Sequence, residues 1–227
     1  MTEKQQMRLE LVKALGGQQG WNLPAIKRVE DYIYGNNAKE TDELADGIYL
    51  VFSGQFPATH QLYLHGTTPV TDWMKEHCTG VAVKLGEKSI CVSLFDSAEG
   101  EEITLTENKD ITDWNGYKDN YEDAGADWDG AGNTEHLKAV GLNPEITLLA
   151  NQFIASVAQW RLICLFRKEL NQAIREVGGE ELSGWYWTST ECSATHAWHL
   201  ALSNGSMRHT TKASYKYRVR PVSAFIL

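Results

Sequence analysis

The sequence predicts an α+β fold, because strand-like runs open the main part of the chain, helical patterns follow, and strand-like runs return at its end. A parallel α/β sheet would require strands and helices to alternate. The length of 227 residues fits one large domain with a small appendage. Hydrophobic residues make up 42% of the chain and charged residues 22%, which allows a sizeable core. We expect a helical segment at residues 1–44 and one larger domain at residues 45–227.

The N-terminal segment shows helical patterns. Apolar residues recur among charges over residues 3–15, and the Gly16-Gly17 pair ends that pattern. Pro24 suits the first turn of a second helix, which ends before Gly35. Residues 36–46 are polar and predict a loop or linker.

Short β-rich runs follow this segment. Residues 47–52 form a β-rich run, and the strand-like residues 61–65 follow after a turn that contains Gly and Pro. Residues 80–85 and 89–95 are separated by three residues that begin with Gly86, and this spacing predicts a β-hairpin.

The middle of the chain is expected to change from loops to helices. Residues 96–135 contain many Gly, Asp and Asn residues with little periodicity, so this stretch is expected to be loop-rich. Helices are expected at residues 143–158 and 165–177. The second has an apolar stripe from Leu165 to Val177 and is ended by Gly178-Gly179.

Three further strands are expected, at residues 185–189, 197–202 and 217–222. In the middle run apolar side chains alternate with His199 and Ala201, which predicts one core face and one exposed face. The Ser-Asn-Gly sequence after this run predicts a tight turn.

The chain is acidic overall and basic at its end. A formal net charge of −9 argues against nucleic-acid binding, since phosphate contacts require basic surfaces. From Ser183 onward, five Lys and Arg residues accompany a single carboxylate, that of Glu191. These cations would either steer an anionic partner toward the protein or neutralise the protein's own acidic face.

The N-terminus, the apolar runs and the cysteine spacing limit which cellular location and which kinds of cysteine site we expect. Met1–Val12 lacks the apolar region of a secretory signal, and no apolar run approaches the roughly 18 residues of a membrane span. We therefore expect no membrane insertion, and a location in the cytoplasm or in a phage particle. The cysteines lack CxxC spacing, which disfavours a zinc ribbon or a thioredoxin-type site and predicts free, mostly buried thiols.

The segment from Trp185 to Leu227, called the cassette below, carries a family resemblance. It contains WYWTSTE from Trp185, AWHL from Ala197, SNG from Ser203 and YRVRPVSAF from Tyr217. These motifs resemble the C-terminus of C-type-lectin-fold proteins of the formylglycine-generating-enzyme-like subgroup. Within that subgroup, the chain looks most like the variable proteins of diversity-generating retroelements from gut bacteria and their phages.

The resemblance extends upstream in the same order. The matching residues are Asp129-Gly130 with Asn133-Thr134, Trp160-Arg161-Leu162, Glu169-Leu170 and Gly178-Gly179. Together with the cassette they cover roughly residues 45–227. The resemblance implies a C-type lectin fold with short antiparallel strands, two main helices and long loops. In that fold we expect the strands at Trp185 and Tyr217 to share a sheet.

The resemblance also implies a ligand-binding protein of the receptor or adhesion type. In retroelement variable proteins, exposed positions are diversified by mutation of adenines while the frame is kept. The frame here would be Trp187, Trp198, Leu200, Gly205, Val219 and Val222. The candidate ligand-binding residues, all reachable from an Asn codon by changing adenines only, are His196, His199, Ala201, Ser206, Arg208, His209, Thr210, Thr211 and Ser214. The implied partner is a protein or glycan on a cell or phage surface, and relatives include trimers.

No metal or cofactor is expected. His196 and His199 are three residues apart, so in a strand they point to opposite faces and do not converge on a metal ion. The stretch Asp127–Glu135 has carboxylates and an amide at alternate positions, as a calcium loop would, but it lacks the frame of an EF-hand. An Asx-turn-rich loop, whose side chains cap their own backbone, is the simpler interpretation.

No catalytic site is legible. Formylglycine-generating enzymes act through paired cysteines near the C-terminus, whereas Cys192 has no partner in that region, so the resemblance does not imply this activity. Ser189 with His196 or His199 forms no nucleophile elbow, and the sequence contains no Gly-rich phosphate loop. A structural module of a phage tail and a hydrolase-like enzyme remain the alternatives to a ligand-binding protein.

Overall fold

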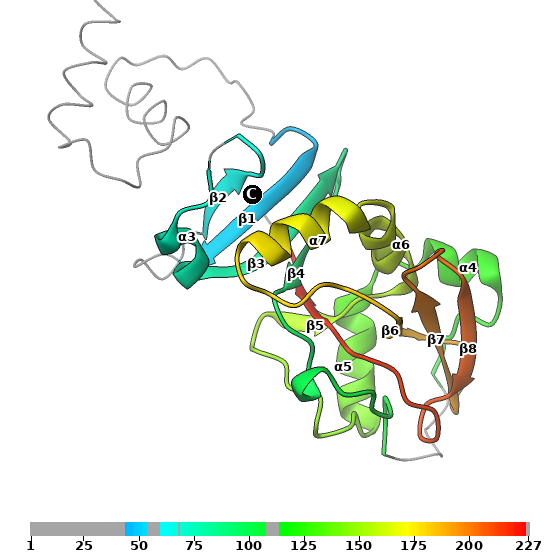
Figure 1. The fold of residues 1–227 in the computed structure, drawn as a ribbon. Helices are drawn as coiled ribbons and strands as arrows, with labels where there is room; N and C mark the ends of the chain where they lie inside the picture. Colours follow the sequence, from blue (N-terminus) through cyan, green and yellow to red (C-terminus); the bar gives the residue numbers. More distant parts are fainter. Residues whose placement is uncertain (1–43, 54–59, 68, 108–113, 226–227) are drawn as a thin grey trace, which may run out of the picture. The chain divides into compact units, whose positions relative to one another are not determined.

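The structure is a computed structural model that describes residues 44–53, 60–67, 69–107 and 114–225. The chain divides into two units, Met1–Glu43 and Leu44–Leu227, and the described residues all belong to the second. The helices predicted before Gly35 therefore lie outside the described residues. The described part is α+β with antiparallel sheets, in agreement with the predicted class (Figure 1). Within it, no helix is both long enough and apolar enough to cross a membrane.

The larger sheet of the described residues has six strands in the order β2-β1-β3-β4-β9-β5, and every neighbouring pair is antiparallel. The strands are β1 (Gly47–Ser53), β2 (His60–Leu64), β3 (Cys78–Leu85), β4 (Lys88–Ser93), β5 (Gln152–Ile154) and β9 (Pro221–Ser223). The predicted hairpin is present as β3 and β4, with Gly86 in the turn at a φ of 57°. Glycine adopts such a positive φ without steric cost, which explains why the turn forms there.

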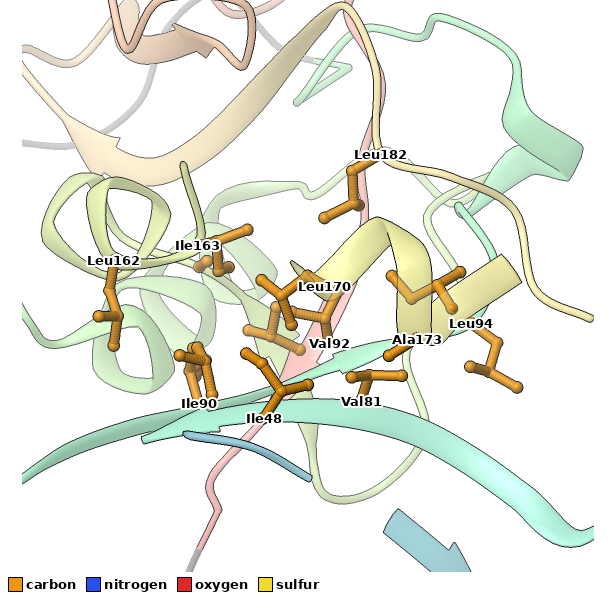
Figure 2. Packing of buried hydrophobic residues seen from close by; sticks show 14 of the residues in the cluster. Ile48, Val81, Ile90, Val92, Leu94, Leu162, Ile163, Leu170, Ala173 and Leu182 are labelled. Carbon is orange, nitrogen blue, oxygen red and sulfur yellow. The ribbon is translucent and has the colours of Figure 1, made fainter. Parts of the chain in front are cut away.

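One face of the larger sheet packs against two helices, α6 (Val157–Leu165) and α7 (Arg167–Glu176) (Figure 2). Val81 on β3 and Val92 on β4 point to this face, and both are fully buried. Leu170 of α7 meets them and is fully buried as well. Burial of one such aliphatic side chain contributes about 1.5–3 kcal/mol, so this face forms the main core of the domain.

The smaller sheet consists of β6 (Trp185–Glu191), β7 (His196–Ala201) and β8 (Met207–Thr211), in that order and antiparallel. β6 and β7 correspond to predicted strands, whereas β8 is not predicted. Its sequence, MRHTT, shows no apolar alternation, because the strand lies at the edge of the sheet and no residue in it is fully buried. Pairing with β7, rather than its own side chains, makes it a strand.

Both faces of β7 are covered. On one face Trp198 packs against Ala124 of α4 (Tyr121–Ala126) and against Val157. On the other, Ala197 belongs to a cluster that includes Leu137 of α5 (Gly130–Val140). The predicted exposed face is therefore wrong: His199 and Ala201 are each only 3% exposed. Alternation places the two side chains on one face of the strand, but it does not show that a further layer covers that face.

The run predicted as one strand at residues 217–222 divides between the sheets. Tyr217 forms a bridge with Ile103, and Arg218 forms a parallel bridge with Tyr186 of β6. From Pro221 onward the chain is β9, which pairs with β4 and β5. The expectation that the strands at Trp185 and Tyr217 share a sheet is thus met at the Arg218 bridge and is wrong for β9.

The helix predicted at residues 143–158 is wrong. Residues 143–151 are irregular, because the Asn143 side chain accepts a hydrogen bond from the Glu145 backbone N–H at 3.0 Å and forms a local turn. β5 follows, and α6 begins only after Ser156, whose backbone N–H donates to the Gln159 side chain at 2.9 Å. This contact is typical of a helix N-terminus.

The helix predicted at residues 165–177 begins two residues later than expected. Phe166 has φ −105° and ψ 18°, which separates α6 from α7, and Leu165 is 68% exposed rather than part of the apolar stripe. In the described residues, α4 lies within the stretch expected to be loop-rich, and α5 begins in it. Two further short helical segments, α3 (Asp72–His77) and the 3-10 turn η1 (Ala98–Gly100), are also not predicted.

Candidate ligand-binding face

The predicted frame of the cassette is buried. Its five large residues, Trp187, Trp198, Leu200, Val219 and Val222, are each 0–1% exposed. Trp187 Nε1 donates to the Ile103 carbonyl at 2.8 Å, and Trp160 Nε1 donates to the Trp187 carbonyl at 3.1 Å. Gly205 has a φ of 71° in the turn between β7 and β8, a conformation that favours glycine. These residues hold the sheet in place and leave other side chains to form a surface.

Lys212, which follows β8, and Glu191, the last residue of β6, form a buried ion pair. The Lys212 ammonium group donates to Glu191 Oε1, and the two side chains are 1% and 0% exposed. His136 Nε2 lies 3.4 Å from the second carboxylate oxygen. Burial raises the pKa of Glu191 and lowers the pKa of Lys212, while their mutual attraction opposes both shifts. Lys212 is therefore a structural cation.

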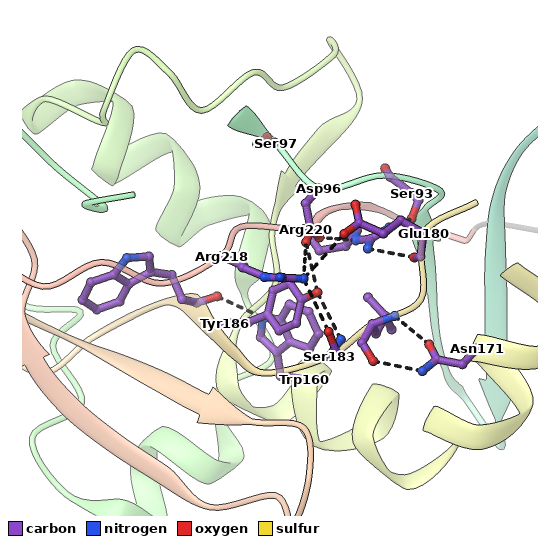
Figure 3. Close-up of polar contacts among 12 residues, drawn as sticks. Ser93, Asp96, Ser97, Trp160, Asn171, Glu180, Ser183, Tyr186, Arg218 and Arg220 are labelled. Atoms are coloured by element: carbon purple, nitrogen blue, oxygen red, sulfur yellow. Dashed lines mark hydrogen bonds and ion pairs between the residues drawn. The ribbon is translucent and has the colours of Figure 1, made fainter. Parts of the chain in front are cut away.

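A second buried pair joins Arg220 to Asp96 (Figure 3). Arg220 Nε donates to one Asp96 oxygen, and the Tyr186 hydroxyl donates to the other at 3.1 Å. Burial raises the pKa of Asp96, and the Arg220 cation opposes that shift. Arg218, nearer the surface, lies 3.8 Å from Asp96 and 3.5 Å from Glu180.

These pairs separate the cassette cations into two groups. Lys212, Arg218 and Arg220 neutralise carboxylates of the protein itself. Arg208 and Lys216 are exposed, and neither forms an ion pair within the part of the chain that the structure describes. Neutralisation thus accounts for three of the cations, and the other two have no carboxylate partner among the described residues.

The nine candidate ligand-binding residues differ in exposure. Arg208, His209 and Ser214 are exposed, His196, Ser206, Thr210 and Thr211 are partly exposed, and His199 and Ala201 are buried. β8 and the turns beside it carry the exposed members. The surface available to a ligand is therefore the edge of the smaller sheet rather than the centre of β7.

One face of this edge carries a row of aromatic rings. Trp198 and His209 are paired across β7 and β8, with ring centroids 5.0 Å apart. His209 is 6.0 Å from His196, and Tyr121 of α4 is 5.0 Å from Trp198. Tyr121 is 61% exposed, and its part in this row is not predicted, since α4 itself is not predicted.

The opposite face is built around His199. His199 is paired with Trp187 on β6 and with Arg208 on β8, so these side chains share a face. Tyr217 stacks on the His199 ring with a centroid distance of 4.2 Å. The Arg208 guanidinium lies 5.9 Å from the centroid of the Trp185 ring. Trp185 and Tyr217 are not among the candidate residues, although the two-residue spacing from Trp187 places Trp185 on the same face.

The Asp127–Glu135 stretch is a helix start. Asp129 caps α5 by accepting from the Gly132 N–H at 2.9 Å. The Asp127 carboxylate accepts from Asn133 Nδ2 at 2.7 Å and from the Thr190 hydroxyl at 2.6 Å. Across the described ranges, no group of three or more His, Cys, Asp or Glu side chains is arranged to hold a metal ion.

The hollows of the described surface include the following two. One is lined by Lys118, Asp123, Ala126, Asp127, Trp128 and Asp129. The other is lined by His65, Gly66, Thr67, Pro69, Val70, Gln172 and Glu176. In the second, His65 Nε2 lies 2.9 Å from Glu176 Oε2, while the Thr67 hydroxyl donates to the Leu64 carbonyl at 2.7 Å. The Thr67 hydroxyl is thus already engaged by the backbone.

Comparison with known proteins gives a similarity in structure. No protein-family model matches the chain, and no curated protein matches it. A fimbrial protein from Bacteroides ovatus, known from a crystal structure, is similar in structure, with a TM-score of 0.56 and 15% sequence identity over 80% of this chain. The match covers 49% of that protein, so this chain spans about half of its length. At this identity the comparison shows a shared fold.

Proposed function

We propose that this chain is a ligand-binding protein of the receptor or adhesion type that binds through the exposed edge of its cassette. The observation that carries the proposal is the contrast between β7, which is buried except at its first residue, and β8 beside it, which presents Arg208 and His209 to solvent. Because β8 is paired with the buried strand β7, its backbone is held in place before a partner binds. Binding therefore loses little conformational entropy.

The fimbrial protein from Bacteroides ovatus supports this role. A fimbrial protein with a similar arrangement of elements agrees with a place at a cell or particle surface. The proposed partner is a protein or glycan on a cell or phage surface, and no nucleic acid. Catalysis is not part of the proposal.

The C-type lectin fold and retroelement diversification belong to the proposal as well. The upstream motifs occupy structural positions: Asp129 caps α5, Trp160 bonds to Trp187, and Gly178 follows α7 with a φ of 83°. The position of β9 in the larger sheet, apart from β6, counts against the C-type lectin fold, whereas the bridge between Arg218 and Tyr186 supports it. The genomic test is a near-identical copy of the cassette DNA beside a reverse-transcriptase gene, with differences confined to template adenines. Absence of such a copy would remove the retroelement claim and leave the binding proposal standing.

The binding proposal is tested with a matched pair of triple variants. The cassette variant replaces Arg208, His209 and Ser214 with Ala. The control variant replaces three exposed residues of α7 with Ala, namely Lys168, Glu169 and Arg175. Labelled wild-type protein is applied to a glycan array and, by flow cytometry, to panels of bacterial and mammalian cells. We expect at least one probe to bind, the cassette variant to lose that binding and the control to keep it. Because all six positions are exposed, both variants should unfold within about 0.5 kcal/mol per site of wild type.

Two results would contradict the proposal. One is a wild-type protein that binds none of the probes. The other is a cassette variant that binds as well as the control. The first result would favour a structural module of a phage tail, which needs no ligand-binding edge. The second would place the binding surface outside the edge of the cassette.

A further inference from the structure

β8 is an outer strand of the smaller sheet, and among the described strands it pairs with β7 alone (Figure 1). At the end of that ladder the Lys212 N–H donates to the Thr195 carbonyl at 3.0 Å. In an antiparallel pair, the N–H and C=O groups of every second residue point toward the partner strand. Counting back from Lys212, the main-chain groups of Thr210 and Arg208 therefore face β7.

The main-chain groups of the alternate residues, Met207, His209 and Thr211, point away from β7. The Thr211 carbonyl accepts from the N–H groups of Ser214 and Tyr215 in the turn that follows. No group of the described residues bonds to the main chain of Met207 or His209 on this side. The outer edge of β8 thus offers hydrogen-bond donors and acceptors to another strand.

The opposite edge of the smaller sheet is already covered. The Trp187 N–H of β6 donates to the Arg218 carbonyl, and the Ser189 N–H donates to the Ala155 carbonyl, both at 2.9 Å. β8 has no such cover among the described residues, and it contains neither the proline nor the bulge that often blocks pairing at an edge. A further strand can therefore join the sheet at β8 rather than at β6.

The outer edge of β8 is complementary to itself. When two copies pair antiparallel about a two-fold axis through His209, the five residues of the strand overlap completely. The two His209 residues then lie opposite each other and exchange N–H···O bonds. Thr211 of each copy donates to the Met207 carbonyl of the other, and Arg208 lies opposite Thr210. An axis through Arg208 would instead place two guanidinium groups opposite each other, which is destabilising.

We propose that two copies of this chain pair through the outer edges of β8, antiparallel and in the register centred on His209. The two smaller sheets then form one continuous sheet, and because both edges are used, assembly stops at a dimer. The pairing uses main-chain groups, so the Arg208 side chain stays on a face of the sheet. The inference goes beyond the proposed function, since it places two cassettes side by side and allows a surface with repeated ligands to be bound at two points.

The first test is sedimentation equilibrium of the full chain at neutral pH, up to about 0.5 mM protein. Because the paired strand has only five residues, we expect a weak dimer with a dissociation constant on the order of 100 µM. His209→Pro removes the outward N–H and should weaken the dimer at least about tenfold. His209→Ala, the matched control, keeps that N–H and should dimerise like wild type. Urea unfolding checks that both variants are folded.

The second test is disulfide formation, which reports the register. It uses a background with Cys164→Ser and Cys192→Ser, because these two thiols are partly exposed. His209→Cys should form a disulfide-linked dimer under mild oxidation, since Cα atoms paired at this position lie about 5.5 Å apart. Thr210→Cys should not, because its two copies are diagonal neighbours about 7–8 Å apart. Adding Arg208→Cys to Thr210→Cys should restore the link.

Three results would overturn the inference. They are a wild-type chain that stays monomeric at about 0.5 mM, a trimer in place of a dimer, and a folded His209→Pro variant that dimerises as well as His209→Ala. Disulfide formation no faster in His209→Cys than in Thr210→Cys would contradict the register.

The proposed function and the dimer can fail separately. If the chain stays monomeric, and His209→Pro loses a cell or array probe that His209→Ala keeps, β8 pairs with a segment of the partner instead. The inference is then wrong while the proposed function stands. A dimer with the expected register and no binding of any probe would support the inference and remove the proposed function.

Discussion

Lys212 and Glu191 form an ion pair from which solvent is excluded, with the two side chains 1% and 0% exposed. Glu191 ends β6, and Lys212 directly follows β8. The Lys212 carbonyl also accepts from the Leu105 N–H at 3.0 Å, so the pair joins both outer strands of the smaller sheet to the segment before α4. The edge that carries the candidate ligand-binding residues depends on this buried contact.

Removing one partner of the Lys212–Glu191 pair should destabilise the protein strongly. Lys212→Met leaves the Glu191 carboxylate buried without its cation, and we expect a loss of about 3–5 kcal/mol in urea unfolding. The double variant Glu191→Gln, Lys212→Met should recover a large part of that loss. Arg175→Met breaks an exposed pair with Glu181 and serves as the control, with an expected change within about 0.5 kcal/mol. If Lys212→Met changed stability no more than this control, the structural role of the pair would be wrong.

His199 should make the protein less stable in acid. Its folded-state pKa of about 4 lies below the ordinary value of 6.5. Between these values the unfolded state binds the extra proton, so stability is fully present above pH 6.5 and falls as the pH decreases toward 4. The contribution lost between pH 7 and pH 4.5 is on the order of 2 to 3 kcal/mol.

The measurement for His199 is urea unfolding at a series of pH values. His199→Phe should lose less stability than wild type over this range, because the other titrating groups are shared by both proteins. Parallel pH profiles for the two proteins would show that His199 is not the group responsible.

The break between α6 and α7 predicts different effects for two leucines that the sequence pattern placed on one stripe. Leu170 is fully buried, so Leu170→Ala should cost about 2–5 kcal/mol. Leu165 is 68% exposed, so Leu165→Ala should change stability by less than about 0.5 kcal/mol. Thermal or urea unfolding compares them directly, and equal losses would show that the two helices form one continuous apolar stripe.

Asp127 and Asp129 are expected to act as hydrogen-bond acceptors for the protein itself. Asp129→Ala removes the cap of α5 and should cost about 1 kcal/mol. Asp127→Ala leaves buried Asn133 and Thr190 without their acceptor and should cost more, about 2–4 kcal/mol. Melting curves in calcium chloride and in EDTA should coincide, and a calcium-dependent rise in Tm would instead identify a metal site.

The sequence predicted the elements whose signals are local. The β3–β4 hairpin follows from two β-rich runs and Gly86 between them, and the alternation over residues 197–202 placed Trp198 and Leu200 on the core face of a strand. β8 was missed because its strand character comes from pairing with β7. α5 was missed because its Gly, Asn and Thr residues resemble a loop, although Asn133 and Thr134 are buried and bonded.

The exposure of the candidate ligand-binding residues was predicted correctly for some of them and wrongly for others. Arg208, His209 and Ser214 lie on the surface as expected, whereas Trp185 and Tyr217 entered only as members of the family motifs and not as candidate residues. A partly exposed side chain that also packs against the core occurs in the same sequence motif as a side chain that is fully buried. Only its exposed fraction and its neighbours distinguish the two.

The sequence by itself determined the α+β class, the hairpin and the buried frame of the cassette, because these depend on the local spacing of apolar and turn-forming residues. The tertiary structure alone decided that His199 and Ala201 are covered and that Lys212, Arg218 and Arg220 neutralise internal carboxylates. The physical reason is that alternation along a strand shows which side chains share a face. Whether a second layer covers that face, and which charges meet beneath it, depends on segments far apart in the chain, such as Asp96 and Arg220.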